Sequence, residues 1–340
     1  MMRRDRRNLW RLPLLAAAAA FTFSATAAKA EPRTVRIAQQ FGISYLPLTI
    51  MQQKHLLESE GKKLGLDLTT EWTHFSNGAA MNNALLSGSL DIASGGVGPL
   101  VTAWARTKGK QDIKGLCALN SMPLYLNTID PNVKTIKDFT AKDKIALPAV
   151  RVSMQAVILQ MAALKMLGKG HEHDLDKYTV SLSHPDGLAQ MMSFKSEITG
   201  HFTSAPFMYQ ELANPKVHRV LNSYDVFGGP HTFNVVWAMG DFYKKNPKIV
   251  QAFLSALKIA MADIKKDPKA AAALWVKANH SKLPVEQAEA IVTKPENTFT
   301  MTPQKVMVVA NYMADVKMVP NRPKSWKDMF IDAIHNLPGS

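Results

Sequence analysis

The residues from His74 to Pro99 could bind a small ligand through the main chain. They read HFSNGAAMNNALLSGSLDIASGGVGP, in which Asp91 is the only ionisable residue besides the leading histidine. A strand is expected to pass into a helix at two places, Phe75–Gly78 and Ser94–Pro99. Glycine lets a ligand approach the backbone, and the free N–H groups at a helix start attract anions. The stretch therefore predicts a site for a carboxylate, sulfonate or nitrate.

An ordinary structural role for the same residues stays open. Ser76 or Asn77 can cap a helix, and Pro99 suits a first helical turn. Both junctions could then be tight connections without a ligand.

The sequence does not indicate an enzymatic site. Gly96-Val97-Gly98 begins like the fingerprint of dinucleotide-binding enzymes, but Val101 occupies the third glycine position. The hydrolase motif G-x-S-x-G is missing, and no histidine has a motif-linked nucleophile. We predict no catalytic residues, and an exported enzyme on an α/β scaffold remains the alternative.

Metal and nucleic-acid sites are not expected either. His171-Glu172-His173-Asp174 offers donor atoms but follows Gly168-Lys169-Gly170, a context that fits an exposed turn better. The formal charge of +14 is carried largely by scattered lysines, whereas nucleic-acid binding calls for a basic stripe with stacking aromatics. We expect no metal, no cofactor and no nucleic-acid partner.

Alternating strands and helices would position the predicted site. Helical patterns at 46–60, 78–87 and 153–167 separate apolar, β-rich runs. This alternation is typical of parallel sheets covered by helices, whose ligands lie beyond the carboxyl ends of the strands. The predicted strands are 34–40, 66–75, 90–96, 113–120, 124–130, 144–150, 178–184, 198–204 and 231–240.

Only helices are expected after Asp241. Pro268, Pro284 and Pro303 stand near helix starts, where a missing N–H costs nothing. Each helix has one apolar face that needs a cover. We expect this region to wrap back over an α/β lobe, although a separate helical domain is also compatible with the pattern.

The first thirty residues have the pattern of a cleavable secretory signal. The apolar run LPLLAAAAAFTFSATA follows a basic head, and Ala28-Lys29-Ala30 fits a cleavage site. The segment from Asp5 to Arg11 also resembles a twin-arginine signal, so both export routes stay open. The single cysteine, Cys117, cannot form an internal disulfide.

The order of these motifs resembles the periplasmic substrate-binding proteins of nitrate/sulfonate/taurine-type ABC transporters. VRIAQQFGISYLPLTIMQQKHLLE resembles the first strand, ligand loop and first helix of that family, and VKTIKDFTAKDKIALPAV with SMQAVILQMAALKMLG resembles its second-lobe entry. So does EITGHFTSAPFMYQEL. The likeness covers roughly residues 33–320, in order. In the stretch quoted first, the matching positions are Phe75, Gly78, Ala84, Leu85, Gly88, Asp91, Gly96 and Pro99.

The resemblance implies a two-lobed, type II-like periplasmic-binding-protein fold, with mixed sheets flanked by helices and a helical C-terminal region. Residues 1–30 would be the signal peptide, residues 31–120 plus 231–340 the first lobe with the C-terminal helices, and residues 121–230 the second lobe. The ligand would lie between the lobes. Matching positions imply ligand contacts from Ser44, Tyr45, Asn77, Gly78, Gly96, Val97, Ser121, Arg151, Ser153, Thr203, Ser204 and Asn234.

The chain departs from the family pattern in two places. Residues 149–153 read AVRVS where the family often has Gly-Ser, and Arg151 could there pair bidentately with a planar anion or lie solvated on the surface. Residues 197–201 read EITGH, so Glu197 is not followed by the acidic residue and alanine that the family often has, which argues against an amine-bearing ligand such as taurine. The wider family includes thiamine-pyrimidine proteins, whose synthase branch carries a cysteine cluster. The lone Cys117 argues against that activity, and a binder of such a precursor stays an alternative.

The expected function is therefore solute capture for an ABC importer. The chain would be exported to the periplasm, bind a small anionic ligand as a monomer, and deliver it to a membrane permease with its ATPase.

Overall fold

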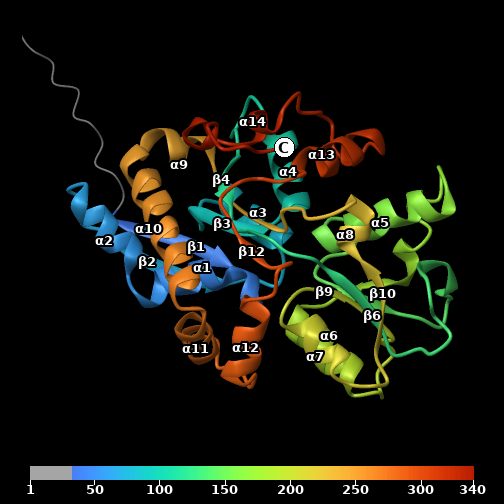
Figure 1. Ribbon diagram of the computed structural model, residues 1–340. Coiled ribbons are helices and arrows are strands. Elements are labelled where there is room, and N and C mark those ends of the chain that lie inside the picture. The colour runs from blue at the N-terminus through green and yellow to red at the C-terminus, as the bar shows by residue number, and fades with distance from the viewer. Residues whose placement is uncertain (1–32) are drawn as a thin grey trace, which may run out of the picture. The chain divides into compact units, whose positions relative to one another are not determined.

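The computed structural model describes residues 33–340, which form two mixed sheets with flanking helices (Figure 1). The predicted signal segment, residues 1–30, lies outside the described residues. We call the part built on the first sheet the first lobe and the part built on the second sheet the second lobe.

The first sheet has the strand order β2-β1-β3-β11-β4. β1 runs parallel to β2 and β3, whereas β11 runs antiparallel to both β3 and β4. Its core is apolar, since the side chains of Val35, Ile37, Ile92 and Val236 are fully buried. The strands are β1 (Thr34–Gln39), β2 (Thr69–His74), β3 (Ile92–Gly96), β4 (Lys114–Ala118) and β11 (Asn234–Ala238). The helices between them are α1 (Leu46–Gln53), α2 (Leu56–Lys63), α3 (Gly78–Leu86) and α4 (Val97–Thr107).

The second sheet has the order β10-β6-β9-β7-β8. β7 is parallel to β8 and β9, and β6 is antiparallel to β9 and β10. The strands are β6 (Tyr125–Thr128), β7 (Ile145–Leu147), β8 (Thr179–Ser181), β9 (Gly200–Thr203) and β10 (His218–Asn222). The helices are α5 (Met154–Leu167), α6 (His184–Met192), α7 (Phe207–Leu212) and α8 (Ser223–Phe227).

The C-terminal helices cover the first lobe, as the sequence predicts. α10 packs against α1 and α2, and α11 packs against α1 (Figure 1). α13 contacts α4 and also α5, and the Trp104 indole donates a hydrogen bond of 2.9 Å to the carbonyl of Asp328. The helices are α9 (Gly240–Lys245), α10 (Pro247–Lys266), α11 (Pro268–Ala278), α12 (Val285–Val292), α13 (Val306–Asp315) and α14 (Trp326–Met329).

The expectation that strands stop after Asp241 is wrong in one detail. β12 (Thr298–Phe299) pairs antiparallel with β5 (Asn120–Ser121), which follows β4. A two-residue strand carries no periodicity, so only its tertiary partner defines it. β10 was not predicted either, and the predicted helix 46–60 divides at His55, whose φ of 49° is left-handed.

The chain passes between the two sheets twice, and the two connections are joined by hydrogen bonds. The first follows β5 and the second follows α8. The Ser121 hydroxyl donates to the carbonyl of His231 at 2.9 Å, and the N–H of Leu124 donates to the Ser223 hydroxyl at 2.9 Å. The His231 ring Nε2 lies 2.8 Å from the Ser223 oxygen. The strands thus divide between the sheets within the predicted lobe ranges, and the lobe boundaries themselves stay a prediction.

No helix within residues 33–340 is long and apolar enough to span a membrane.

Candidate functional site

The starts of helices α4 and α5 meet between the two lobes. A Cβ atom on Gly96, the N-cap of α4, would lie 2.6 Å from the Cβ of Met154, the first residue of α5. A Cβ on Gly98 would lie 3.4 Å from the carbonyl oxygen of Val152. Only glycine allows the 2.6 Å approach at position 96, so Gly96 makes room for the second lobe, and its ligand contact stays a prediction.

The facing helix starts carry partial charges of the same sign. Each N-terminus has about half a positive elementary charge from the aligned peptide dipoles. Ser153 caps α5, because its hydroxyl accepts from the N–H of Ala156 at 3.2 Å. Gly96 gives α4 no side-chain cap. An anion between the two ends would relieve their mutual repulsion and satisfy free N–H groups.

Two serine hydroxyls, one from each lobe, converge on Gly42. The Ser44 and Ser204 oxygens lie 3.6 and 3.5 Å from the position that a Cβ on Gly42 would take. Both are buried and have no hydrogen-bond partner among residues 33–340. The lobes touch beside them, since the N–H of Ile43 donates to the carbonyl of Ala205 at 3.1 Å. A buried hydroxyl without a partner is costly, so this place is suited to a bound polar group.

Tyr45 and Asn234 also meet, in the first lobe. The Asn234 amide donates to the Tyr45 hydroxyl at 2.9 Å, and the Asn120 amide donates to the Asn234 side-chain oxygen at 3.1 Å. Asn120 also donates to the carbonyl of Ser44 at 2.9 Å. Burial raises the pKa of the Tyr45 hydroxyl, which therefore stays protonated and can donate. This network fixes the backbone that carries Ser44.

Three other predicted site residues have structural partners. The Asn77 side chain caps α3 by accepting from the N–H of Ala80 at 3.0 Å. A Cβ on Gly78 would lie 2.7 Å from the Cβ of Pro99, so this glycine lets α3 pack on α4. Ser121 belongs to the connection between the sheets, where it binds the carbonyl of His231. Their ligand contacts stay predictions. Val97, the first residue of α4, is buried beside Gly96.

Arg151 is not brought to the place where Ser44 and Ser204 converge. Its side chain is 73% exposed, and its Nε lies 3.6 Å from a carboxylate oxygen of Asp176. Its φ of 67° turns the backbone just before α5. This position agrees with a surface arginine, the alternative that the sequence left open.

Asp91, the acidic residue of the first-quoted stretch, serves the fold. Its two oxygens accept from Arg36 Nε at 2.9 Å and Nη2 at 2.8 Å. It also accepts from the N–H of Arg36 at 2.9 Å. This ion pair joins β1 to the turn before β3 and leaves the site without a carboxylate from this stretch.

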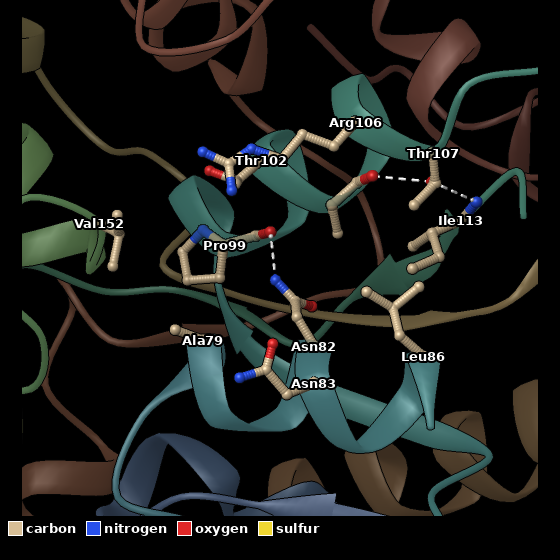
Figure 2. A pocket seen from close by; sticks show the side chains of 11 residues that line it. Ala79, Asn82, Asn83, Leu86, Pro99, Thr102, Arg106, Thr107, Ile113 and Val152 are labelled. Atoms are coloured by element: carbon tan, nitrogen blue, oxygen red, sulfur yellow. Dashed lines mark hydrogen bonds between the residues drawn. The ribbon is translucent and has the colours of Figure 1, made fainter. Parts of the chain in front are cut away.

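A cavity of about 140 Å³ lies between α3 and α4 (Figure 2), and neither serine of the pair lines it. Asn82 donates to the carbonyl of Pro99 at 3.1 Å and accepts from the Trp237 indole at 2.9 Å, so its amide is already used. Thr107 links the carbonyl of Ala103 to the N–H of Ile113 at 2.7 and 3.0 Å. None of the predicted site residues lines this cavity.

Sequence reasoning missed the buried polar residues beneath the second-lobe side of the site. Gln155, His184 and Glu211 are almost fully buried. Gln155 is hydrogen-bonded directly to His184, and His201 links His184 to Glu211. Gln39, at the end of β1, has a buried side-chain oxygen without a partner in the described chain. The usable signal was the histidine inside the predicted strand that became β9, GHFT, because a buried titratable group needs a partner.

No cluster of three or more histidine, cysteine, aspartate or glutamate side chains within residues 33–340 is arranged to hold a metal ion. In the segment predicted to be an exposed turn, His171 pairs with Asp174 and His173 pairs with Asp176, at 2.7 and 2.9 Å.

The sequence profile of the NMT1-like family matches residues 28–277. The chain belongs to the NMT1-like family. No curated protein sequence matches it significantly.

Solved structures share the fold of this NMT1-like chain. The alkanesulfonate-binding protein SsuA from Xanthomonas axonopodis pv. citri has a TM-score of 0.68 and 17% identity, and the match covers 86% of this chain and 96% of that chain. The periplasmic aliphatic sulphonate-binding protein SsuA from Escherichia coli has a TM-score of 0.65 and 19% identity, over 88% and 99%. The periplasmic nitrate-binding protein NrtA from Synechocystis PCC 6803 has a TM-score of 0.64 and 16% identity, over 85% and 83%. The predicted periplasmic-binding-protein fold and the predicted family resemblance are confirmed.

Proposed function

We propose that this chain is the solute-binding component of an ABC importer. It captures a small anion between the two lobes and delivers it to a membrane permease with its ATPase, acting as a monomer in the periplasm. It makes and breaks no bond. The named structural neighbours are sulfonate- and nitrate-binding proteins, which supports this proposal.

The observation that carries the proposal is the pair of buried hydroxyls, Ser44 and Ser204, that converge on Gly42 without partners in the described chain. They come from different lobes, so a ligand that accepts from both stabilises the closed arrangement. Such a ligand contacts both lobes only when they are together, and it shifts the population toward that state.

The electrostatics favour an anion. The starts of α4 and α5 face each other, and the first-lobe start has no side-chain cap. The polar groups predicted to line the ligand site are mainly hydroxyls and amides. The Asp91 carboxylate does not join them, because it is paired with Arg36. Nitrate, an alkanesulfonate or a small carboxylate fits this set of donors.

A thermal-shift screen of the protein starting at Glu31 tests the proposal. The ligands are nitrate, ethanesulfonate, benzoate and a neutral aminopyrimidine. At 100 times its Kd, a ligand adds about 2.7 kcal/mol to the free energy of unfolding and raises the melting temperature by several degrees. Stabilisation by an anion supports the proposal, whereas stabilisation by the pyrimidine alone would favour the thiamine-precursor alternative and overturn it.

Two variants then tie the ligand to the serine pair. Ser44→Ala and Ser204→Ala should each weaken anion binding by about tenfold in isothermal titration calorimetry, since each removes a hydrogen bond to a charged group. Ser59→Ala, on the exposed face of α2, is the matched control and should bind like the wild type. Unchanged affinity in both site variants would remove the serine pair from the ligand site.

A further inference from the structure

A chain of buried hydrogen bonds runs from α7 to the end of β9 in the second lobe. Glu211 Oε1 lies 2.5 Å from His201 Nδ1, and His201 Nε2 lies 3.2 Å from His184 Nδ1. The same His184 nitrogen lies 2.9 Å from the Thr203 hydroxyl, and His184 Nε2 lies 3.1 Å from the Gln155 amide nitrogen. All five side chains are at most 5% exposed.

The two ends of this chain dictate the same proton positions. A carboxylate only accepts, so Nδ1 of His201 carries a proton, and in a neutral ring its Nε2 is then an acceptor. At the other end, the Gln155 amide nitrogen only donates, so His184 Nε2 is also an acceptor and the His184 proton is on Nδ1. That proton points to His201 Nε2 and to the Thr203 oxygen. Each hydrogen bond therefore has one donor and one acceptor.

The consequence falls on Thr203. Its oxygen accepts from His184, so its own O–H hydrogen has to point elsewhere, and no acceptor for it is found in the described chain. Thr203 precedes Ser204, whose unpartnered hydroxyl converges with that of Ser44.

We propose that Glu211, His201 and His184 are positioning residues that hold the Thr203 hydroxyl as a hydrogen-bond donor toward the bound anion. This inference rests on the proposed function and deepens it, because it names the chemical property of the ligand that the second lobe recognises. A ligand group that only accepts hydrogen bonds, such as a sulfonate, nitrate or carboxylate, is selected over an amine or hydroxyl of similar size.

The surroundings of the two histidines favour these proton positions. Burial lowers the pKa of His184 well below its usual value, so His184 is neutral near pH 7. His201 on β9 is the titratable group in contact with His184, and Glu211 on α7 lies on the far side of the His201 ring. The α5 helix contributes the amide of Gln155, and β7 has the apolar sequence Ile-Ala-Leu. The backbone of α6 holds the His201 ring in place, because a Cβ on Gly187 would lie 2.6 Å from its Nε2.

Nuclear magnetic resonance tests the proton positions without any ligand. Long-range proton–nitrogen correlation spectra of the mature protein at pH 7.5 should assign the Nδ1–H form to both His184 and His201. Free histidine favours the Nε2–H form, so this result would not arise by default. An Nε2–H form at either ring, or an imidazolium at His201, would overturn the proposal.

Variants test the effect on binding of the best anion from the ligand screen. Thr203→Val keeps the shape of the side chain and should weaken binding by about tenfold, while Thr203→Ser should restore most of it. Glu211→Met removes the carboxylate that accepts from His201. We expect His184 to change its tautomer and the anion affinity to fall by a similar factor. The matched control is Asp176→Asn, which alters another carboxylate–histidine pair of the same lobe, with a buried carboxylate and a half-exposed histidine, and should leave the affinity within twofold.

The results separate the two proposals. Wild-type binding together with unchanged affinity in Thr203→Val and Glu211→Met would overturn the positioning role and keep the proposed function. Absence of anion binding by the wild type would overturn the proposed function, and with it the role of Thr203, whatever the tautomers are. Should Glu211→Met fail to fold, the tautomer spectra and the two Thr203 variants still decide.

Discussion

Met154 lies directly against Gly96, with its Cβ 2.6 Å from the point at which a side chain on Gly96 would begin. The two residues belong to the starts of α5 and α4, in different lobes. The contact involves the Cβ and Cα of Met154 rather than the far end of a flexible side chain. A side chain on Gly96 would therefore force the lobes apart.

Gly96→Ala should lower ligand affinity by at least tenfold while leaving each lobe folded. The added methyl group prevents the approach of α4 and α5, and the closed form is the one that binds. Titration calorimetry measures the affinity, and small-angle scattering should show a larger radius of gyration in the presence of ligand than for the wild type. Gly200→Ala is the control, because its nearest neighbours would lie at an ordinary 3.4 Å. Wild-type affinity for Gly96→Ala would show that closure does not need this contact.

Asp91→Asn should lower the free energy of unfolding by about 1–2 kcal/mol. The substitution breaks a two-pronged ion pair with Arg36, and Asp91 is only 14% exposed. The figure is kept low because the Arg36 side chain is 38% exposed and its charge is partly screened. Urea unfolding of Asp67→Asn gives the matched comparison, since Arg33 and Asp67 are 75% and 84% exposed and 3.6 Å apart. Equal losses in the two variants would argue against a special role for the Asp91 pair.

Stability should fall as the pH is lowered from 6.5 toward 4. Burial lowers the pKa of His231 from 6.5 to about 4, so the unfolded chain takes up a proton in this range while the native protein does not. Full loss from this residue amounts to about 3 kcal/mol by linkage, and His184, whose pKa is also lowered, adds to it. Urea unfolding at pH 7.5, 6 and 5 measures the slope.

His231→Gln should be less stable than the wild type at pH 7.5 but should show a smaller decline with acid. His171→Gln, at a 55% exposed position, serves as the control and should keep the wild-type slope. The same slope in His231→Gln and the wild type would mean that other groups cause the acid sensitivity.

Gly187→Ala tests which of two opposing effects dominates in α6. Helix propensity alone would make alanine more stable than glycine by about 1 kcal/mol. The added methyl group, however, would meet three atoms of the buried His201 ring at 2.6 to 2.9 Å, and overpacking of this kind costs about 1–3 kcal/mol. We expect net destabilisation in urea unfolding. Ala189→Gly, on the exposed side of the same helix, should show the propensity term alone. A stabilised Gly187→Ala would mean that the ring moves freely.

The sequence predicted the elements of the site well because their signals are local. Asn77 caps a helix where its neighbours suggested it, the helix predicted at 153–167 begins at Met154, and Pro99 lies in the first turn of α4. The strand ends at Gly96 and Thr203 were also predicted within one residue. Alternating apolar patterns and caps depend on neighbours a few positions away, so one chain is enough to read them.

The partners of the polar side chains could not be predicted, because they depend on residues far along the chain. Nothing in the pattern around Arg151 indicates that Asp176 is near it, or that Ser44 and Ser204 converge on Gly42. The glycines were expected to make room for a ligand. In the structure Gly78 makes room for Pro99 and Gly96 for Met154, which only packing between helices decides, and their ligand contacts stay predictions.

The hydrogen bonds that join the two connections between the sheets limit how the lobes can move. Ser121 is held to His231 and Leu124 to Ser223, so neither strand of this joint can bend alone without breaking a buried bond. Two independent connections would allow the lobes to rotate about several axes and to shift relative to each other. A joint whose strands are tied together favours rotation of the lobes about a single axis. Under the proposed function, this rotation would connect the ligand-free and the ligand-bound arrangements.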